Sequence, residues 1–285
     1  LQGACSPGNV VRIQGLVQVY RDKLQLRIDR LQQVEVDAIA REAFVQASHR
    51  GLEEMSGELR QIIGSVKNSF LKKLLTRIFI QDETGEKFLE SPAAKGIHHA
   101  YLGGLLEHSL SMARVAALLA RHYTGIDHDI LVSGALLHDI GKTSELTSEG
   151  GVIDYTDNGR LKGHLVMGCE FVGREAEKIN GFPDDLLTHL QHLVLSHHGR
   201  QEFGSPVVPM TPEALLLGFI DDMDAKMNLV EQLRRKLKSG QTQWSEYQRS
   251  LERYLLLSPL SEDVSDPVRA EEDNPLPAGK QPSLF

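Results

Sequence analysis

The chain has 285 residues, 41% of them hydrophobic, and a formal net charge of −8 at pH 7. This length suffices for one large or two modest domains with a real core, and the composition excludes a disordered protein. The negative balance argues against a protein coated with basic surface for duplex DNA, although a local basic groove remains compatible with it. No apolar run reaches the roughly 18 residues of a membrane span, and no basic region precedes a hydrophobic stretch at the N-terminus. We therefore expect a cytoplasmic protein with no membrane contact.

Cysteine usage supports the same compartment. Cys5 and Cys169 form neither a metal-binding spacing nor a disulfide framework, which fits a reducing environment. The sequence starts at Leu1 rather than at a methionine, which leaves open that it is a piece of a longer protein.

Residues 9–34 alternate apolar and polar side chains with a period of two, the pattern of β-strands. Gly15 predicts a bulge, and residues 21–23 predict a tight hairpin turn. At most three strands fit here, too few to close a barrel, and so small a sheet is marginal alone. We expect residues 1–34 to be a short β segment, either a structural meander or part of a nucleic-acid-binding barrel.

A helical spacing of apolar residues follows from Glu35 to about Phe79, with a break between Ser48 and Gly51. Residues 81–97 are rich in turn-forming residues and predict a loop with at most one short helical turn. We interpret residues 35–95 as a helical region that packs on the domain after it.

Residues 96–257 form the predicted main domain, which makes the chain a mainly α protein. Asp157-Asn158-Gly159 is a strong turn signal and predicts a small β-hairpin over residues 152–162. After Ser258 six acidic side chains stand against two basic ones with little apolar content, so residues 258–285 are expected to be a disordered acidic tail. The predicted helices of the main domain cover residues 110–123, 129–139, 165–179, 184–195, 212–226 and 244–256.

The most informative stretch is the apolar run that ends in His138 and Asp139 and breaks at Gly141. Adjacent histidine and aspartate point two ligands toward one locus, where an imidazole nitrogen suits transition metals and a carboxylate can bridge two cations. His128-Asp129 repeats the dipeptide and is interpreted as the polar start of a helix. A lone buried histidine is usually a satisfied core residue. Here, however, side chains that can bind metal recur beside other apolar segments, and this recurrence favours a metal centre. These side chains are His108, His164, His197, His198 and Asp221.

Five segments carry these residues, and together they resemble the HD-domain superfamily of metal-dependent phosphohydrolases. Within it they are similar to the YhaM-type 3′ to 5′ exoribonucleases, in which an OB-fold precedes an HD domain. The similarity covers essentially residues 9–255, with the OB-fold part weaker, and implies an HD-domain helical bundle behind a partial OB-fold. The segments are HHAYLGGLLEHSLSMA, GALLHDIGK, GRLKGHLVMG, LSHHGRQEFGSP and EALLLGFIDDMDAKM.

The resemblance also implies a ligand set for two divalent metal ions. One ion would be held by His108, His138, Asp139 and Asp221, and Asp221 is preferred over its neighbour because it lies three residues before the family's Asp-Ala pair. A second ion would share Asp139 as a bridge and take His164 and His197, with His198 as an alternate or additional ligand. Nitrogen and oxygen donors without a thiolate fit Mn, Fe, Co or Mg better than a structural zinc site.

Asp139 and Lys142 are the predicted catalytic residues. Two ions that share Asp139 would activate a water, and Lys142 would reach a phosphate oxygen, although it could instead be a solvent-facing lysine at a helix end. His99, Lys142 and Arg200 are the expected contacts to substrate phosphates. Asp224 lies one turn beyond Asp221 and either supports the ligands or forms a surface salt bridge.

The expected activity is that of a 3′ to 5′ exonuclease on single-stranded RNA, with DNA as a second substrate left open. Alternatives are a phosphohydrolase of free nucleotides or cyclic dinucleotides, and a nucleic-acid-binding adaptor. Residues 281–285 are similar to short peptides that dock on bacterial DNA sliding clamps, although chance is a serious rival for so short a pattern. Gln281, Leu284 and Phe285 would then bind this partner. The sequence leaves the oligomeric state open.

Overall fold

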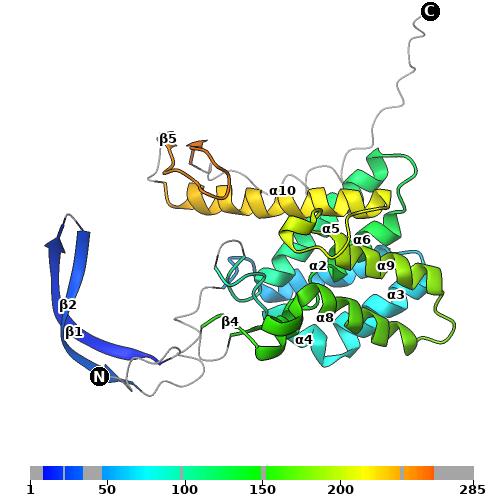
Figure 1. The fold of residues 1–285 in the computed structure, drawn as a ribbon, viewed down its shortest axis with the longest axis horizontal. Coiled ribbons are helices and arrows are strands. Elements are labelled where there is room, and N and C mark those ends of the chain that lie inside the picture. Colours follow the sequence, from blue (N-terminus) through cyan, green and yellow to red (C-terminus); the bar gives the residue numbers. More distant parts are fainter. Residues whose placement is uncertain are drawn as a thin grey trace, which may run out of the picture. The chain divides into compact units, whose positions relative to one another are not determined.

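The computed structural model describes residues 9–21, 23–34, 47–96, 99–148, 152–237 and 241–259. They are mainly α-helical, as predicted (Figure 1). The chain divides into two units, residues 1–228 and 229–285. None of the described helices is long and apolar enough to cross a membrane. The predictions for residues 35–46, for Cys5 and for the tail after Pro259 lie outside the described residues.

The N-terminal β segment is a two-stranded antiparallel ribbon of β1 (Val11–Tyr20) and β2 (Lys23–Gln33). Its register shifts between Gln14 and Gly15, where the bulge was predicted. A side chain cannot replace the hydrogen of Gly15, because a Cβ there would lie 2.1 Å from the carbonyl oxygen of Arg27. Within the described residues 9–21 and 23–34 the segment therefore contains two strands, and its description as part of an OB-fold stays a prediction.

The predicted loop at residues 81–97 is wrong in its first half, which is the helix α4 (Glu83–Glu90). Asp82 caps this helix by accepting a hydrogen bond from the backbone N–H of Thr84, and Phe88 is fully buried. Gly85 is needed for close packing rather than for a turn, since a Cβ would lie 2.4 Å from the carbonyl oxygen of Phe79. Capping and burial therefore outweigh the local turn signal.

Ahead of α4 lie α2 (Leu52–Ser65), α3 (Ser69–Thr76) and the π-helical turn η1 (Arg77–Gln81). His128-Asp129 begins a helix, as interpreted from the sequence, and Asp127 caps it by accepting from two backbone N–H groups. The helices that follow η1 and α4 are α5 (Gly104–His122), α6 (His128–Leu137), α7 (Lys142–Glu145), α8 (Asp157–Glu177), α9 (Asp184–Ser196) and α10 (Pro212–Arg235).

The hairpin predicted at residues 152–162 is also wrong. β4 (Asp154–Tyr155) pairs with β3 (Leu146–Thr147) instead, and the Asp-Asn-Gly signal lies in the first turn of α8. Thr156 explains this, because its hydroxyl accepts from the backbone N–H of Gly159 and caps the helix. Gly163, with φ 73° and ψ 155°, interrupts α8 just before His164.

The helix predicted at residues 244–256 does not form. In the second unit, β5 (Gln243–Trp244) pairs with β6 (Leu256–Leu257). The rings of Tyr247 and Tyr254 lie 5.3 Å apart across this small hairpin. In a helix, side chains seven residues apart would be separated by roughly 10 Å along the axis, so the ring contact requires the hairpin.

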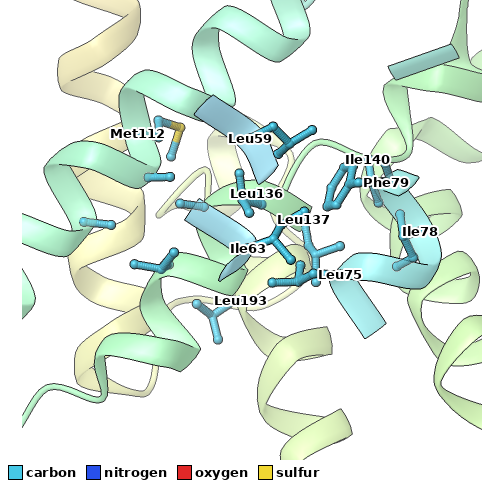
Figure 2. Close-up of a cluster of buried hydrophobic side chains, with 14 of the residues drawn as sticks. Leu59, Ile63, Leu75, Ile78, Phe79, Met112, Leu136, Leu137, Ile140 and Leu193 are labelled. Carbon is cyan, nitrogen blue, oxygen red and sulfur yellow. The ribbon is translucent and has the colours of Figure 1, made fainter. Parts of the chain in front are cut away.

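One hydrophobic core joins α2 and α3 to the helices after residue 104 (Figure 2). Leu59 and Ile63 of α2 pack in the same cluster as Met112 of α5. Leu137 and Ile140, both buried, flank His138 and Asp139 on either side. The core therefore anchors the dipeptide from both ends, which fixes the position of the site.

Candidate metal centre

Asp139 lies at the centre of the site, 2% exposed, just after the end of α6. Its two carboxylate oxygens face different neighbours. Oδ2 lies 3.2 Å from Nε2 of His138 and 3.8 Å from Nε2 of His108. Oδ1 lies 3.4 Å from Nε2 of His164 and 3.6 Å from Nε2 of His197. One carboxylate thus stands between two sets of imidazoles.

The first group consists of His108, His138 and Asp221, which come from α5, the end of α6 and α10. Nε2 of His108 lies 3.2 Å from Nε2 of His138 and 3.3 Å from Oδ1 of Asp221. Asp222, by contrast, is not among the clustered ligand atoms; its side chain is 62% exposed and paired with Lys226. The preference for Asp221 over Asp222 therefore agrees with the geometry.

The second group consists of His164, His197 and His198, from α8 and the end of α9. Their ligand atoms lie within 4.8 Å of one another, as do those of the first group. The HD-type residues expected to bind metal, far apart in the sequence, are thus brought together as two groups around Asp139.

Each of these five histidines has its Nδ1 next to a hydrogen-bond acceptor, at 2.7–3.0 Å. An acceptor at Nδ1 keeps the proton there and directs the Nε2 lone pair into the site, the arrangement common for histidine metal ligands. The acceptors are Asp224 for His108, Glu145 for His164, and the carbonyl oxygens of Ala135, Val194 and Phe203 for His138, His197 and His198.

The first group is strongly charged. Burial opposes protonation of His108, but the hydrogen bonds and charges of Asp221 and Asp224 outweigh it and raise the pKa of His108 to about 9. Burial likewise opposes ionisation of Asp221, yet the hydrogen bond from His108 and the nearby imidazoles hold its pKa far below the usual range. Hydrogen bonds from His108, His99 and Ser111 likewise outweigh burial and lower the pKa of Asp224, so Asp221 and Asp224 both stay ionised at neutral pH.

The second group has the opposite tendency. Burial lowers the pKa of His198 to about 4, and the neighbouring imidazoles of His197 and His164 add to the shift. Burial also lowers the pKa of His197, with Asp139 only partly offsetting it. These two imidazoles are therefore neutral at pH 7, as ligands must be.

The donor atoms of the second group fit a cation. Oδ1 of Asp139, Nε2 of His164 and Nε2 of His197 are buried and have no hydrogen-bond partner. A buried polar atom without a partner costs about 1–3 kcal/mol. Three such acceptors that face one another are what a divalent ion with nitrogen and oxygen ligands requires.

Lys142 and Asp139 form a close ion pair, with Nζ 2.6 Å from Oδ2. Burial opposes the charge of Lys142, but Asp139 outweighs it and raises the pKa of the ammonium group. The side chain is only 12% exposed, so Lys142 is not the solvent-facing lysine of the alternative interpretation.

The other two predicted phosphate contacts lie in different places. His99 is 3% exposed, with Nδ1 2.9 Å from the hydroxyl of Tyr101 and Nε2 3.2 Å from Asp224. Both its nitrogens are engaged behind His108, which does not support the predicted contact with substrate. Arg200 is exposed, and its guanidinium lies 5.9 Å from the ring centroid of Phe203.

Two supporting carboxylates complete the site. Asp224 accepts from His108, His99 and the hydroxyl of Ser111, so it supports the ligands rather than forming a surface salt bridge. Glu145 was not predicted. It accepts from both the backbone N–H and the ring of His164, at 2.9 and 3.0 Å. Its place after Lys142 in a four-residue helix carries no periodic signal that could have identified it.

The predicted partner-binding residues Gln281, Leu284 and Phe285 lie outside the described part of the chain, so clamp binding stays a prediction.

Comparison with known proteins identifies an HD domain over residues 105–226. The protein named 3′-5′ exoribonuclease YhaM of Bacillus subtilis is 34% identical over 237 residues, which covers 83% of this chain and 74% of that protein. The YhaM protein of Shouchella clausii is 36% identical over 235 residues, covering 81% and 72%. That of Listeria monocytogenes is 34% identical over 233 residues, covering 81% and 73%. No solved structure gives a significant match.

Proposed function

The chain belongs to the YhaM family of HD-domain metal-dependent phosphohydrolases, and from that premise we propose that it is a 3′ to 5′ exonuclease of single-stranded RNA. The observation that carries the proposal is the position of Asp139, whose two oxygens face two separate groups of ligands. This arrangement suits two cations that share one carboxylate, and such pairs recur in enzymes that cleave phosphodiesters.

The ligands divide between two ions. His108, His138 and Asp221 would hold one, His164, His197 and His198 the other, and Asp139 would bridge them. Bound divalent ions, for which Mn, Fe, Co and Mg are the candidates, would supply a water of lowered pKa and neutralise charge on a phosphodiester oxygen.

Lys142 has the position of a phosphate-binding residue. It lines a cavity together with His197, His198 and Asp221, so a phosphodiester in that cavity meets its ammonium group. Because the pKa of Lys142 is raised by Asp139, the side chain stays charged and can stabilise negative charge that develops on a non-bridging oxygen. The positive charge of Lys142 also compensates the negative charge of the Asp139 carboxylate.

Asp224 and Glu145 orient the ligands. Asp224 holds Nδ1 of His108 at 2.7 Å, and His99 holds Asp224 from the other side at 3.2 Å. Glu145 holds His164 in the same way. Rings held in this way would direct Nε2 of His108 and of His164 toward bound metal ions.

Hydrolysis at the last linkage would break the bond between phosphorus and the 3′ oxygen of the penultimate nucleotide. The products are a nucleoside 5′-monophosphate and an RNA that ends in a 3′-hydroxyl and can be cut again. The hydroxyl of the attacking water stays on phosphorus, and its proton ends on solvent or on the departing 3′ oxygen.

The test uses purified protein with Mn and a 5′-labelled single-stranded RNA. A ladder shortened from the 3′ end, with release of mononucleotides, is expected. Single-stranded DNA of the same sequence, free nucleotides and cyclic dinucleotides are assayed in parallel. Hydrolysis of free nucleotides or cyclic dinucleotides without shortening of any oligomer would replace the proposal by the alternative phosphohydrolase activity. Binding of RNA or DNA without hydrolysis of any substrate would instead support the nucleic-acid-binding adaptor.

A further inference from the structure

The cavity beside the ligands has one wall that the hydrolysis of a phosphodiester does not explain. Its volume is about 260 Å³, just below the range of roughly 300–1,000 Å³ for small-molecule pockets. Lys142, His197, His198 and Asp221 line one part. Phe203 lines another, and it is the one large apolar side chain among the described residues of the lining.

Phe203 is tied to the ligand cluster through its backbone. Its carbonyl oxygen accepts a hydrogen bond from Nδ1 of His198 at 2.9 Å. It ends a short 3-10 turn, η3 (Gln201–Phe203), whose last N–H bonds back to Arg200. The backbone under the ring is therefore held at a fixed place relative to His198.

The ring itself is left uncovered. Phe203 is 64% exposed, so the face of its ring is accessible to a ligand in the cavity. The guanidinium of Arg200 lies 5.9 Å from its ring centroid. An aromatic ring next to a cation is the combination on which single-stranded nucleic acids stack their bases.

Another part of the cavity lining comes from α10, which packs closely beside the ligands. A Cβ at Gly218 would lie 2.9 Å from the carbonyl oxygen of His197, so only glycine lets this helix pack beside the ligands. Ala225, one further lining residue from α10, is also small. Of the α10 residues that line the cavity, Gly218 and Ala225 are small, and the other two are Asp221 and Asp222, so this side carries no large apolar side chain that could cover Phe203.

We propose that Phe203 is the base-stacking residue of the site, on which the 3′-terminal base of a single-stranded substrate lies while its phosphate faces Lys142. The inference rests on the proposed function. Because every base has a π face and the ring offers no hydrogen-bonding edge, binding here is independent of base identity and requires an unpaired end.

The test compares Phe203→Ala with Phe219→Ala. Phe219 is a matched control, because it is equally exposed, at 64%, and lies on α10 outside the cavity lining. Phe203→Ala is expected to raise KM for a single-stranded RNA about tenfold, with kcat within about twofold of wild type. Phe219→Ala is expected to leave both unchanged, and Phe203→Trp to restore KM. Equal KM values for Phe203→Ala, Phe219→Ala and wild type would overturn the inference.

Fluorescence separates this inference from the proposed activity. The chain has one tryptophan, Trp244, so Phe203→Trp combined with Trp244→Phe places a single indole at the cavity. Stacking predicts quenching when an oligomer with cleavage-resistant phosphorothioate linkages at its 3′ end is added. Quenching supports base stacking whether or not RNA is hydrolysed, and an unchanged emission spectrum contradicts it. Failure of the proposed function would instead appear as intact RNA with the wild-type protein.

Discussion

The two groups of ligands on either side of Asp139 differ in charge: the first contains ionised groups, and the second contains imidazoles whose pKa values are lowered. His108 in the first group stands between Asp221 and Asp224, and its pKa is raised to about 9. In the second group burial lowers the pKa of His197, and that of His198 to about 4. A cation that enters the first group must displace a proton, whereas the second group already presents neutral imidazoles. The two positions should therefore differ in affinity and in pH dependence.

The largest loss of metal binding and of hydrolysis is expected for a substitution of Asp139, which lies between the two groups of ligands. Asp139→Asn removes the charge that both ions share, so metal should be lost from both positions and hydrolysis should fall on the order of 10³-fold. Elemental analysis and turnover measure this. The matched control is Asp222→Asn, at the exposed neighbour of a ligand, which should keep both metals. Full metal content in Asp139→Asn would place the centre elsewhere.

A substitution at Gly141 should disturb metal binding by the second group of ligands more than by the first. A Cβ at Gly141 would lie 2.1 Å from the carbonyl oxygen of His164, so Gly141→Ala must push α8 away from Asp139. A loss of stability of about 3 kcal/mol is expected in chemical denaturation, with weakened metal binding. Gly57→Ala is the control, because nothing lies within 4 Å of its Cβ and alanine favours the helix. Unchanged stability of Gly141→Ala would contradict the close packing of α8.

Substitutions of the two supporting carboxylates should affect metal binding at the two groups of ligands independently. Glu145→Gln loosens His164 and Asp224→Asn loosens His108, and each should weaken one metal-binding step by about 10- to 100-fold while sparing the other. Calorimetric titration of the metal-depleted protein measures the two steps. If both variants weaken the same step, the division into two groups is wrong.

The smallest effect concerns the pH dependence of the metal-free protein. The pKa of His108 is raised from 6.5 to about 9, so its stabilising contribution is full below pH 6.5 and is lost as pH rises toward 9. The pKa of His198 is lowered from 6.5 to about 4, so its contribution is full above pH 6.5 and is lost as pH falls toward 4.

Thermal unfolding of the metal-free protein should therefore have its highest midpoint near pH 6.5. His108→Gln should flatten the alkaline side and leave the acid side in place. A wild-type midpoint that keeps rising between pH 7 and 9 would show that His108 is not held between two carboxylates.

Much of the fold follows from local patterns. Period-two alternation and Gly15 correctly indicated the β1–β2 ribbon and its bulge, and the helical spacing indicated α5, α6, α9 and α10. The failures at residues 81–97 and 152–162 share a cause. Gly85 and Gly159 look like turn residues, yet each lets its helix pack closely against a carbonyl oxygen of a preceding element, that of Phe79 for Gly85 and that of Glu145 for Gly159. Sequence spacing does not distinguish a glycine that bends the chain from one that admits a neighbour.

For the site, the sequence by itself determined the ligand types, since His138-Asp139 and the recurring histidines beside apolar helices indicate a metal centre. The resemblance to the HD domain had already implied how these ligands divide, and only the tertiary structure decided which atoms face one another and which side chains support them. It turned one oxygen of Asp139 toward each group, buried His99 behind His108, and brought Glu145 to His164. These outcomes depend on the packing of α5, α8, α9 and α10 around one carboxylate, and contacts between residues so far apart in the chain leave no local pattern to read.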